Sequence, residues 1–114
     1  MTLQVVFLRS AECDLKDLRA YILKRFGSHV WQDSYRQIKD SVKTIAQFPE
    51  SGCIPDELEN LGLAQYRQVI AGMNRIIYET RNSTVYIHIV CDTRKDLRSL
   101  LMARLLVAGA HRQR

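Results

Sequence analysis

The spacing of apolar residues changes near the middle of this chain, and that change limits the folds open to it. Between residues 15 and 45, apolar side chains recur every three or four positions, which is the period of an amphipathic helix. From residue 66 onwards they gather in short runs rich in β-branched and aromatic residues, separated by turn residues. A helical first half followed by several strands predicts an α+β domain in which helices cover a sheet.

Two consecutive helices are predicted after a short opening strand. The β-formers at 3–8 predict the strand, and Ser10 is expected to cap the first helix. Gly27 should end that helix, Ser28 should cap the second, and Pro49 should close it. Because the turn between them is short, we expect an antiparallel hairpin. Its apolar stripes are Leu15, Leu18, Ile22 and Phe26, then Trp31, Tyr35, Ile38, Val42 and Ile45.

A long loop over about residues 49–64 should lead from the hairpin to three strands. Its prolines, glycines and acids are typical of loops, and loops of this length are often functional. Short turns between the strands predict an antiparallel meander. The strands are expected at 66–70, 74–80 and 84–91.

A last helix should follow, capped by Asp96 or Thr93 and carrying Leu97 and Leu101 on its apolar side. A flexible tail is expected over about 108–114. The predicted order is therefore β-α-α-β-β-β-α. It forms one domain over residues 1–114, with an antiparallel sheet packed on the N-terminal helical hairpin and a C-terminal helix.

Composition excludes several classes of protein. With 114 residues, 46% hydrophobic and 25% charged, the chain has the balance of one globular domain. No apolar run approaches the ~20 residues that cross a bilayer, and no signal-peptide pattern opens the chain. We therefore expect a cytoplasmic protein that does not engage membranes. The three cysteines, in no CxxC spacing, predict reduced thiols.

The positive charge is concentrated in the C-terminal half. Residues 1–60 hold eight basic and nine acidic side chains, a net −1, whereas residues 61–114 hold nine basic and three acidic, a net +6. All of those nine basic residues except Lys95 are arginines, which suit phosphate and carboxylate recognition. An anionic partner is therefore plausible, although a basic half is also common on proteins that are simply soluble.

One face of the sheet is expected to be open and basic. Alternate residues of a strand share a face, so an apolar set of Val85, Ile87, Ile89 and Cys91 would turn His88 outward. Such a face could hold RNA, and a histidine among arginines could move a proton, although most single strand histidines are structural. The expected open face comprises Arg67, Arg75, Glu79, Tyr86 and His88, with Arg94 and Lys95 just beyond the strand end.

A metal site is not expected. His88, Cys91 and Asp92 are ligand types, but positions 88 and 91 of one regular strand point to opposite faces. No cofactor is expected either.

Four stretches resemble the RelE/ParE superfamily of bacterial toxins from type II toxin–antitoxin modules. They are Tyr66–Ile70, Asn74–Glu79, Val85–Val90 and Arg94–Leu97, and the predicted order of elements matches as well. The resemblance implies a toxin neutralised by an antitoxin protein. It also implies one of two activities, because RelE-type members cleave mRNA on the ribosome whereas ParE-type members poison DNA gyrase and are not nucleases.

Only part of the nuclease pattern is present. Arg67 and Arg75 match basic sheet positions of nucleolytic members, and Lys95 lies near a third. Val69 stands where a second strand lysine would fall. His88 lies inside its strand and does not match the histidine–tyrosine pair found at the strand end in some members.

The proton-transfer groups of the nuclease are the missing part. Leu100 and Leu101 occupy the region of the helix tyrosine, and after His88 there is only His111 and no tyrosine. RNA cleavage needs groups that accept and deliver protons. Because the sequence offers cations without a clear acid, it favours the ParE-type activity.

These observations predict a ParE-type toxin that inhibits gyrase by binding, with no catalytic residues. The alternative is a ribosome-dependent mRNA endoribonuclease, and a third possibility is a non-toxic basic RNA-binding module. The expected target-binding residues are Arg67, Arg75, Arg94, Lys95 and Arg98, and the residues of the alternative nuclease are Arg67, Arg75, His88 and Lys95.

Overall fold

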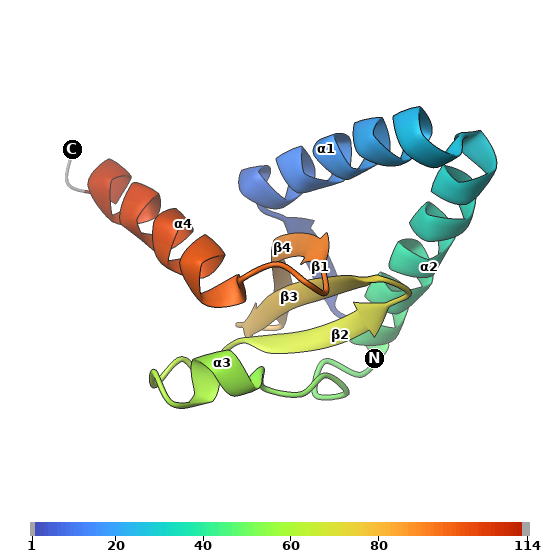
Figure 1. Ribbon diagram of the computed structural model, residues 1–114. Helices are drawn as coiled ribbons and strands as arrows, with labels where there is room; N and C mark the ends of the chain where they lie inside the picture. The colour runs from blue at the N-terminus through green and yellow to red at the C-terminus, as the bar shows by residue number, and fades with distance from the viewer. Residues whose placement is uncertain (1, 113–114) are drawn as a thin grey trace.

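The computed structural model describes residues 2–112 of the chain, with side chains up to residue 104. The elements are β1 (Gln4–Phe7), α1 (Arg9–Phe26), α2 (Ser28–Gln47), α3 (Asp56–Glu59), β2 (Arg67–Ala71), β3 (Asn74–Arg81), β4 (Thr84–Asp92) and α4 (Leu97–Arg112). This order confirms the predicted α+β architecture (Figure 1). The short helix α3 was not predicted and lies within the expected loop. Helix α4 continues to Arg112, into the segment expected to be a tail, and residues 113–114 lie outside the described residues.

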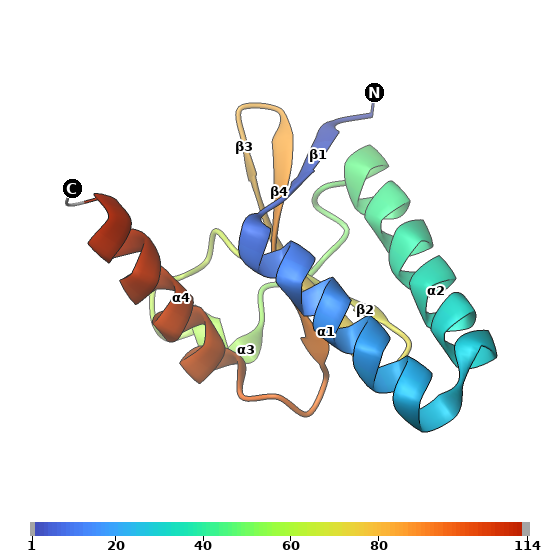
Figure 2. The same cartoon turned by 90° about the horizontal axis from the view of Figure 1, so that it is seen from above.

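The strands form one sheet in the order β1-β4-β3-β2. The β2/β3 and β3/β4 pairs are antiparallel, which confirms the predicted meander. Strand β1 instead pairs in parallel with β4, beside which it lies in Figure 2. The sheet is thus mostly antiparallel, with β1 and β2 at its edges. Within the described residues, no helix has both the length and the apolar character needed to span a bilayer.

Helices α1 and α2 form the predicted hairpin. Gly27, at φ +91°, separates them, and Figure 2 shows α2 running back beside α1. The predicted caps are wrong, because Leu8 and Gly27 precede the two helices and neither provides a side-chain cap. Ser10 lies inside α1, where its hydroxyl donates to the His88 carbonyl at 3.4 Å.

The hairpin covers one face of the sheet, called here the hairpin face. Ile38 and Ile45 of α2 are fully buried there, as the apolar stripe predicted, and Ala11 of α1 joins them. The sheet residues in this cluster come from all three strands of the meander. They are Ala71, Ile76, Tyr78, Val85, Ile87 and Val90.

A β-bulge in β4 changes which side chains share a face. Ile77 pairs with Ile89 and Tyr78 pairs with Ile87, so His88 is the extra residue. Ile89 therefore joins a second core cluster on the opposite face, called here the outer face, while Val90 returns to the hairpin face. The predicted common face for Val85, Ile87, Ile89 and Cys91 is wrong for this reason.

The outer face is covered and not open. Leu58 of α3 and two residues of α4, Leu97 and Leu101, are buried against Ile77 and Ile89. The prediction left this side open to water or to a partner because it used only the helical hairpin to cover the sheet. In the structure, α3 and α4 provide the second cover, and the sheet lies between two apolar clusters.

Candidate functional site

Arg67 does not share a face with Arg75, contrary to the prediction. It pairs with Tyr78 across β2 and β3, and Tyr78 packs on the hairpin face. Its Nη1 donates to the carbonyl of Gly52 at 2.8 Å and to that of Glu50 at 3.5 Å. The guanidinium therefore holds the segment that follows α2.

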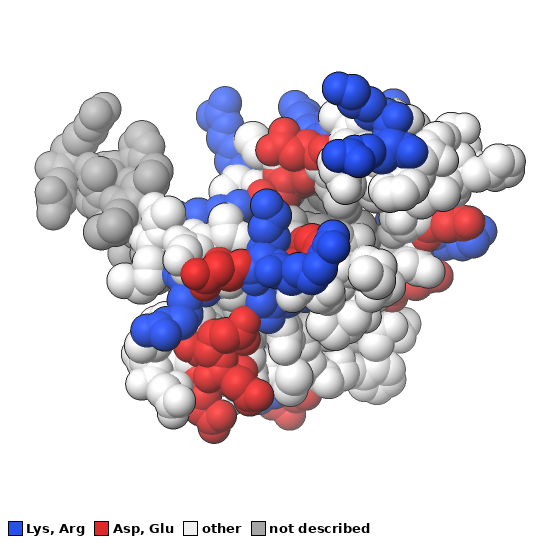
Figure 3. Space-filling model, in the orientation of Figure 1, with Lys and Arg blue, Asp and Glu red and all other residues white. Residues whose placement is uncertain are grey.

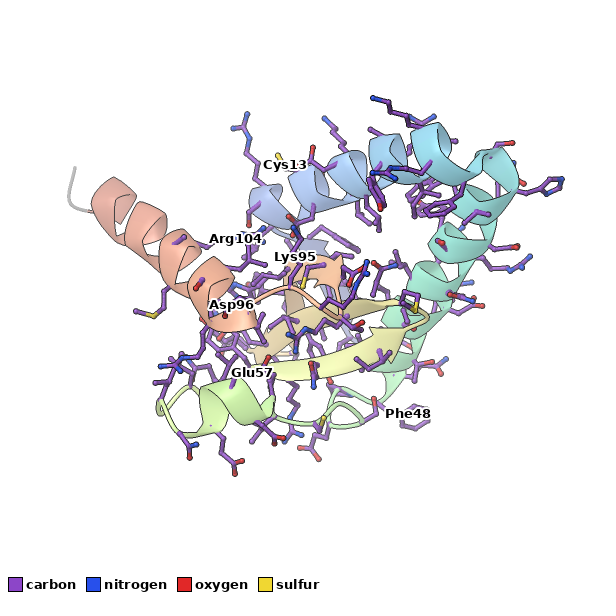
Figure 4. All side chains as sticks on the ribbon, viewed as in Figure 1. Cys13, Phe48, Glu57, Lys95, Asp96 and Arg104 are labelled. Carbon is purple, nitrogen blue, oxygen red and sulfur yellow. The ribbon has the colours of Figure 1, made fainter. Side chains whose placement is uncertain are left out.

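Arg75 lies on the outer face but is only 7% exposed. Its Nη2 donates to Glu57 Oε2 at 2.8 Å and to the Lys95 carbonyl at 3.0 Å, and its Nη1 donates to Gln68 Oε1 at 3.1 Å. The bond with Arg75 holds the pKa of Glu57 below its ordinary value. Figure 4 shows Glu57 on α3 and Lys95 just before α4. Arg75 thus connects α3 and the start of α4 to Gln68 of β2.

His88 is engaged by neighbours on the same face. Its Nε2 lies 2.8 Å from Glu79 Oε1, and its ring meets the Tyr66 ring edge-on at 5.1 Å between centroids. Burial lowers the pKa of His88 despite the opposing effect of Glu79. A lowered pKa favours the neutral imidazole, and an ionised Glu79 accepts only from a protonated Nε2. A buried imidazole bonded in this way is not presented to a phosphodiester.

The segment between β4 and α4 carries the most exposed of the expected cations. Arg94 makes a two-point pair with Asp92, with Nε–Oδ1 at 2.9 Å and Nη2–Oδ2 at 3.0 Å, and this pair lowers the pKa of Asp92. Lys95 and Arg98 are also exposed, and within the described residues neither makes an ion pair. We call Arg94, Lys95 and Arg98 the cation cluster.

Asp96 begins α4 as one of the two predicted caps. Its Oδ1 accepts from the Ser99 amide at 3.3 Å and its Oδ2 from the Ser99 hydroxyl at 2.8 Å. These bonds lower the pKa of Asp96 and fix the start of the helix beside Lys95 (Figure 4).

An open cleft of about 780 Å³ lies between α1, the end of β4 and α4. Leu18, Val90 and Leu100 give it apolar walls, and the Asp14–Arg104 ion pair, 2.6 Å between Nη2 and Oδ1, joins its two sides. Figure 4 shows Arg104 between α4 and α1. Its remaining lining includes Asp17, Tyr21, Cys91, Asp92, Arg94 and Lys95.

Internal pairs neutralise much of the C-terminal positive charge. Arg75 and Arg104 each pair with an acid from the first 60 residues, and Arg94 pairs within its own segment. On the side shown in Figure 3, cations lie across the middle of the molecule and an acidic cluster lies over α3. The expected basic open face is therefore replaced by a smaller cation cluster at the start of α4.

His88 and Cys91 do not point to opposite faces of the sheet, contrary to the prediction. The bulge puts His88 and Cys91 on the same outer face, since Cys91 pairs with Arg75 across β3 and β4 and packs beside the second core cluster. Within the described residues, no three His, Cys, Asp or Glu side chains are grouped to hold a metal ion.

The sequence matches, over residues 5–97, the family described as the ParE toxin of the type II toxin–antitoxin system parDE. The match covers well over half of the chain, and the chain belongs to this family of toxins, within the RelE/ParE superfamily. The segment beyond it contains almost all of α4. A search by sequence against curated proteins finds no match.

Solved structures share the fold. A chain from the chromosomal ParDE toxin–antitoxin system of P. aeruginosa superposes with a TM-score of 0.65 at 15% identity, covering 80% of this chain and 96% of that one. A chain from the RelBE2 toxin–antitoxin complex of Mycobacterium tuberculosis gives 0.56 at 21% identity, covering 81% and 99%. At these identities the likeness concerns the fold alone.

Proposed function

We propose that this toxin inhibits DNA gyrase by binding to it and has no catalytic chemistry of its own. The state of the nuclease candidates carries the proposal. His88 is bonded to Glu79, Arg75 is buried and bonds to three partners, and Arg67 binds backbone carbonyls on the other face. Cleavage by the 2′-hydroxyl needs proton donors and acceptors that converge on one exposed point, and these groups do not.

The proposed contact with the target is the cation cluster. Lys95 and Arg98 need no rearrangement to meet an acidic surface, whereas Arg94 would first have to leave Asp92. Arg67 and Arg75, also expected to bind the target, act in this proposal through the fold. They hold the segment after α2 and the start of α4 in place.

A cognate antitoxin completes the proposed function. The matched family is that of a type II toxin–antitoxin system, and the two solved neighbours are described as parts of toxin–antitoxin assemblies. An antitoxin segment that folds on binding is the expected partner. The proposed site of action is the cytoplasm.

A paired assay separates gyrase from the ribosome. Purified toxin should block supercoiling by gyrase, or accumulate cleaved gyrase–DNA complexes, while mRNA on translating ribosomes stays intact. Unaffected gyrase together with codon-specific mRNA cleavage would establish the RelE-type activity instead. If expression of the intact chain does not inhibit bacterial growth, that result would favour the RNA-binding module.

A further inference from the structure

The end of the helical hairpin carries large apolar side chains that the core does not use. Phe26 is 59% exposed, Tyr21 is 49% exposed and Val30 is 41% exposed. We call Tyr21, Phe26 and Val30, with the cations Lys24 and Arg25, the hairpin tip. The last two turns of α1 and the first turn of α2 supply these residues, and Figure 1 shows this end of the hairpin projecting beyond the sheet.

The exposed rings of the tip pack against each other and against a cation. Tyr21 and Phe26 pack edge to face with centroids 6.2 Å apart, and the Arg25 guanidinium lies 5.6 Å from the centre of the Tyr21 ring. One turn further along α2, Trp31 and Tyr35 stack at 5.4 Å. Ordered aromatic and arginine side chains lose little conformational freedom on binding, which is typical of the residues that dominate protein interfaces.

The charge at the tip is of one sign. Between Asp17 and Asp33 the sequence has no acidic residue, and the tip itself carries Lys24 and Arg25. The first turn of α2 likewise has no acid and no side-chain cap. The first amides of α2 lie next to the last carbonyls of α1, so the positive charge of the tip comes from Lys24 and Arg25.

We propose that the hairpin tip is a second docking surface for the protein target of the toxin, and that it takes an acidic segment bearing apolar side chains. Carboxylates of such a segment would meet Lys24 and Arg25, and its apolar side chains would cover Phe26 and Val30. A protein suits the tip better than a nucleic acid, because the aromatic rings already pack in pairs and Val30 adds aliphatic surface.

The tip adjoins the surface already assigned to the target. Tyr21 belongs to the tip and also lines the cleft that contains Arg94 and Lys95. One partner could therefore contact the tip, the cleft wall and the cation cluster. The inference rests on one part of the proposed function, namely that the toxin acts by binding a protein.

Two tip variants and two matched controls test the proposal in cells and with purified gyrase. The tip variants are Phe26→Ser with Val30→Ser, and Lys24→Glu with Arg25→Glu. The controls are Phe48→Ser, a 63% exposed aromatic at the far end of α2 (Figure 4), and Lys16→Glu with Arg19→Glu, exposed earlier in α1. Growth inhibition is compared at equal soluble expression, after circular dichroism shows native helix content.

Each tip variant should lose growth inhibition by about tenfold or more, and raise the half-inhibitory concentration against gyrase by a similar factor, with both controls near wild type. Tip variants as toxic as wild type would overturn the proposal, even if they escape a neutralising antitoxin. The proposal would also be overturned if the wild-type protein bound phosphatidylglycerol vesicles and both tip variants lost that binding, since the tip would then bind lipid.

The failures of the two proposals differ. If wild type does not inhibit gyrase but growth inhibition still depends on the tip, the gyrase assignment fails and the docking surface stands. A wild-type chain that inhibits neither growth nor gyrase overturns both.

Discussion

The Arg104 guanidinium and the Asp14 carboxylate form a two-point ion pair, with Nη2–Oδ1 at 2.6 Å and Nη1–Oδ2 at 2.9 Å. Arg104 Nη1 also donates to the His88 carbonyl at 2.8 Å, and Asp14 Oδ2 accepts from the Val90 amide at 3.0 Å. These bonds join α4, α1 and the bulged part of β4. They hold α4 in place next to the cation cluster.

Replacing Arg104 by Leu should lower the free energy of unfolding by about 2 kcal/mol. Fully buried pairs cost ~3–5 kcal/mol when one partner is removed, and this pair is partly exposed, so the remaining Asp14 can be hydrated in part. Urea unfolding of wild type, Arg104→Leu, Asp14→Leu and the double variant forms a double-mutant cycle that gives the coupling free energy between the two side chains. Additive losses in that cycle would show that the two side chains do not act as a pair.

Arg75→Met should lower the free energy of unfolding by about 3 kcal/mol at neutral pH, because it leaves Glu57 and the Lys95 carbonyl without their donor. Arg94→Met removes a solvent-exposed pair and should cost much less than Arg75→Met. Urea unfolding compares the two arginines directly. Equal losses would contradict the buried role of Arg75.

The Arg75–Glu57 pair should also give stability a pH dependence. The pKa of Glu57 is lowered from its ordinary value of 4.5, so the pair stabilises the fold fully above that pH and loses its effect as pH falls through the lower folded-state pKa. The difference between wild type and Arg75→Met should therefore shrink between about pH 6 and about pH 3, modestly because Glu57 is partly exposed. A difference that stays constant over this range would contradict the pairing.

Gly52→Ala should destabilise the fold by about 1–3 kcal/mol through overpacking. A Cβ at this position would lie 2.6 Å from the Tyr78 hydroxyl and 2.7 Å from the Gln68 carbonyl oxygen. That hydroxyl also accepts from the Gly52 amide at 3.1 Å and donates to the Pro49 carbonyl at 2.7 Å, so it cannot move aside freely. Thermal unfolding checks the loss, with the exposed neighbour Glu50→Ala as the control.

Toxicity should depend on charge in the cation cluster and not on His88. Lys95→Glu with Arg98→Glu should remove most growth inhibition, and Arg94→Glu with Lys95→Glu should do the same, since these reversals repel an acidic partner. His88→Ala should keep toxicity within a few-fold at matched soluble expression, whereas loss of a catalytic group costs ~10²–10⁴-fold. Full toxicity of both reversals would exclude the cation cluster as the target surface.

Periodicity in the sequence was sufficient for the helical hairpin and the meander. The helical spacing of apolar residues predicted the stripe that contains Ile38 and Ile45. The turn residues Asn82 and Ser83 predicted the β3–β4 turn, and both have positive φ in the structure. The caps of α1 and α2 were missed because Leu8 and Gly27 precede these helices and neither makes a side-chain cap bond.

The site was harder to predict because one bulged residue reverses a face. His88 disturbs the alternation in β4, and nothing in a run of apolar residues marks which of them is extra. The partners of Arg75 and Arg104 were missed for another reason. Glu57 and Asp14 lie 18 and 90 positions away, and only the packed α3 and α4 bring them near.

Titration of gyrase with purified toxin tests the central claim most directly, with relaxed plasmid DNA as substrate and supercoiling as the signal. Wild type and His88→Ala should inhibit with similar half-inhibitory concentrations, and Lys95→Glu with Arg98→Glu should need about tenfold more protein. Supercoiling that continues unchanged at a large excess of folded wild-type toxin would contradict the account.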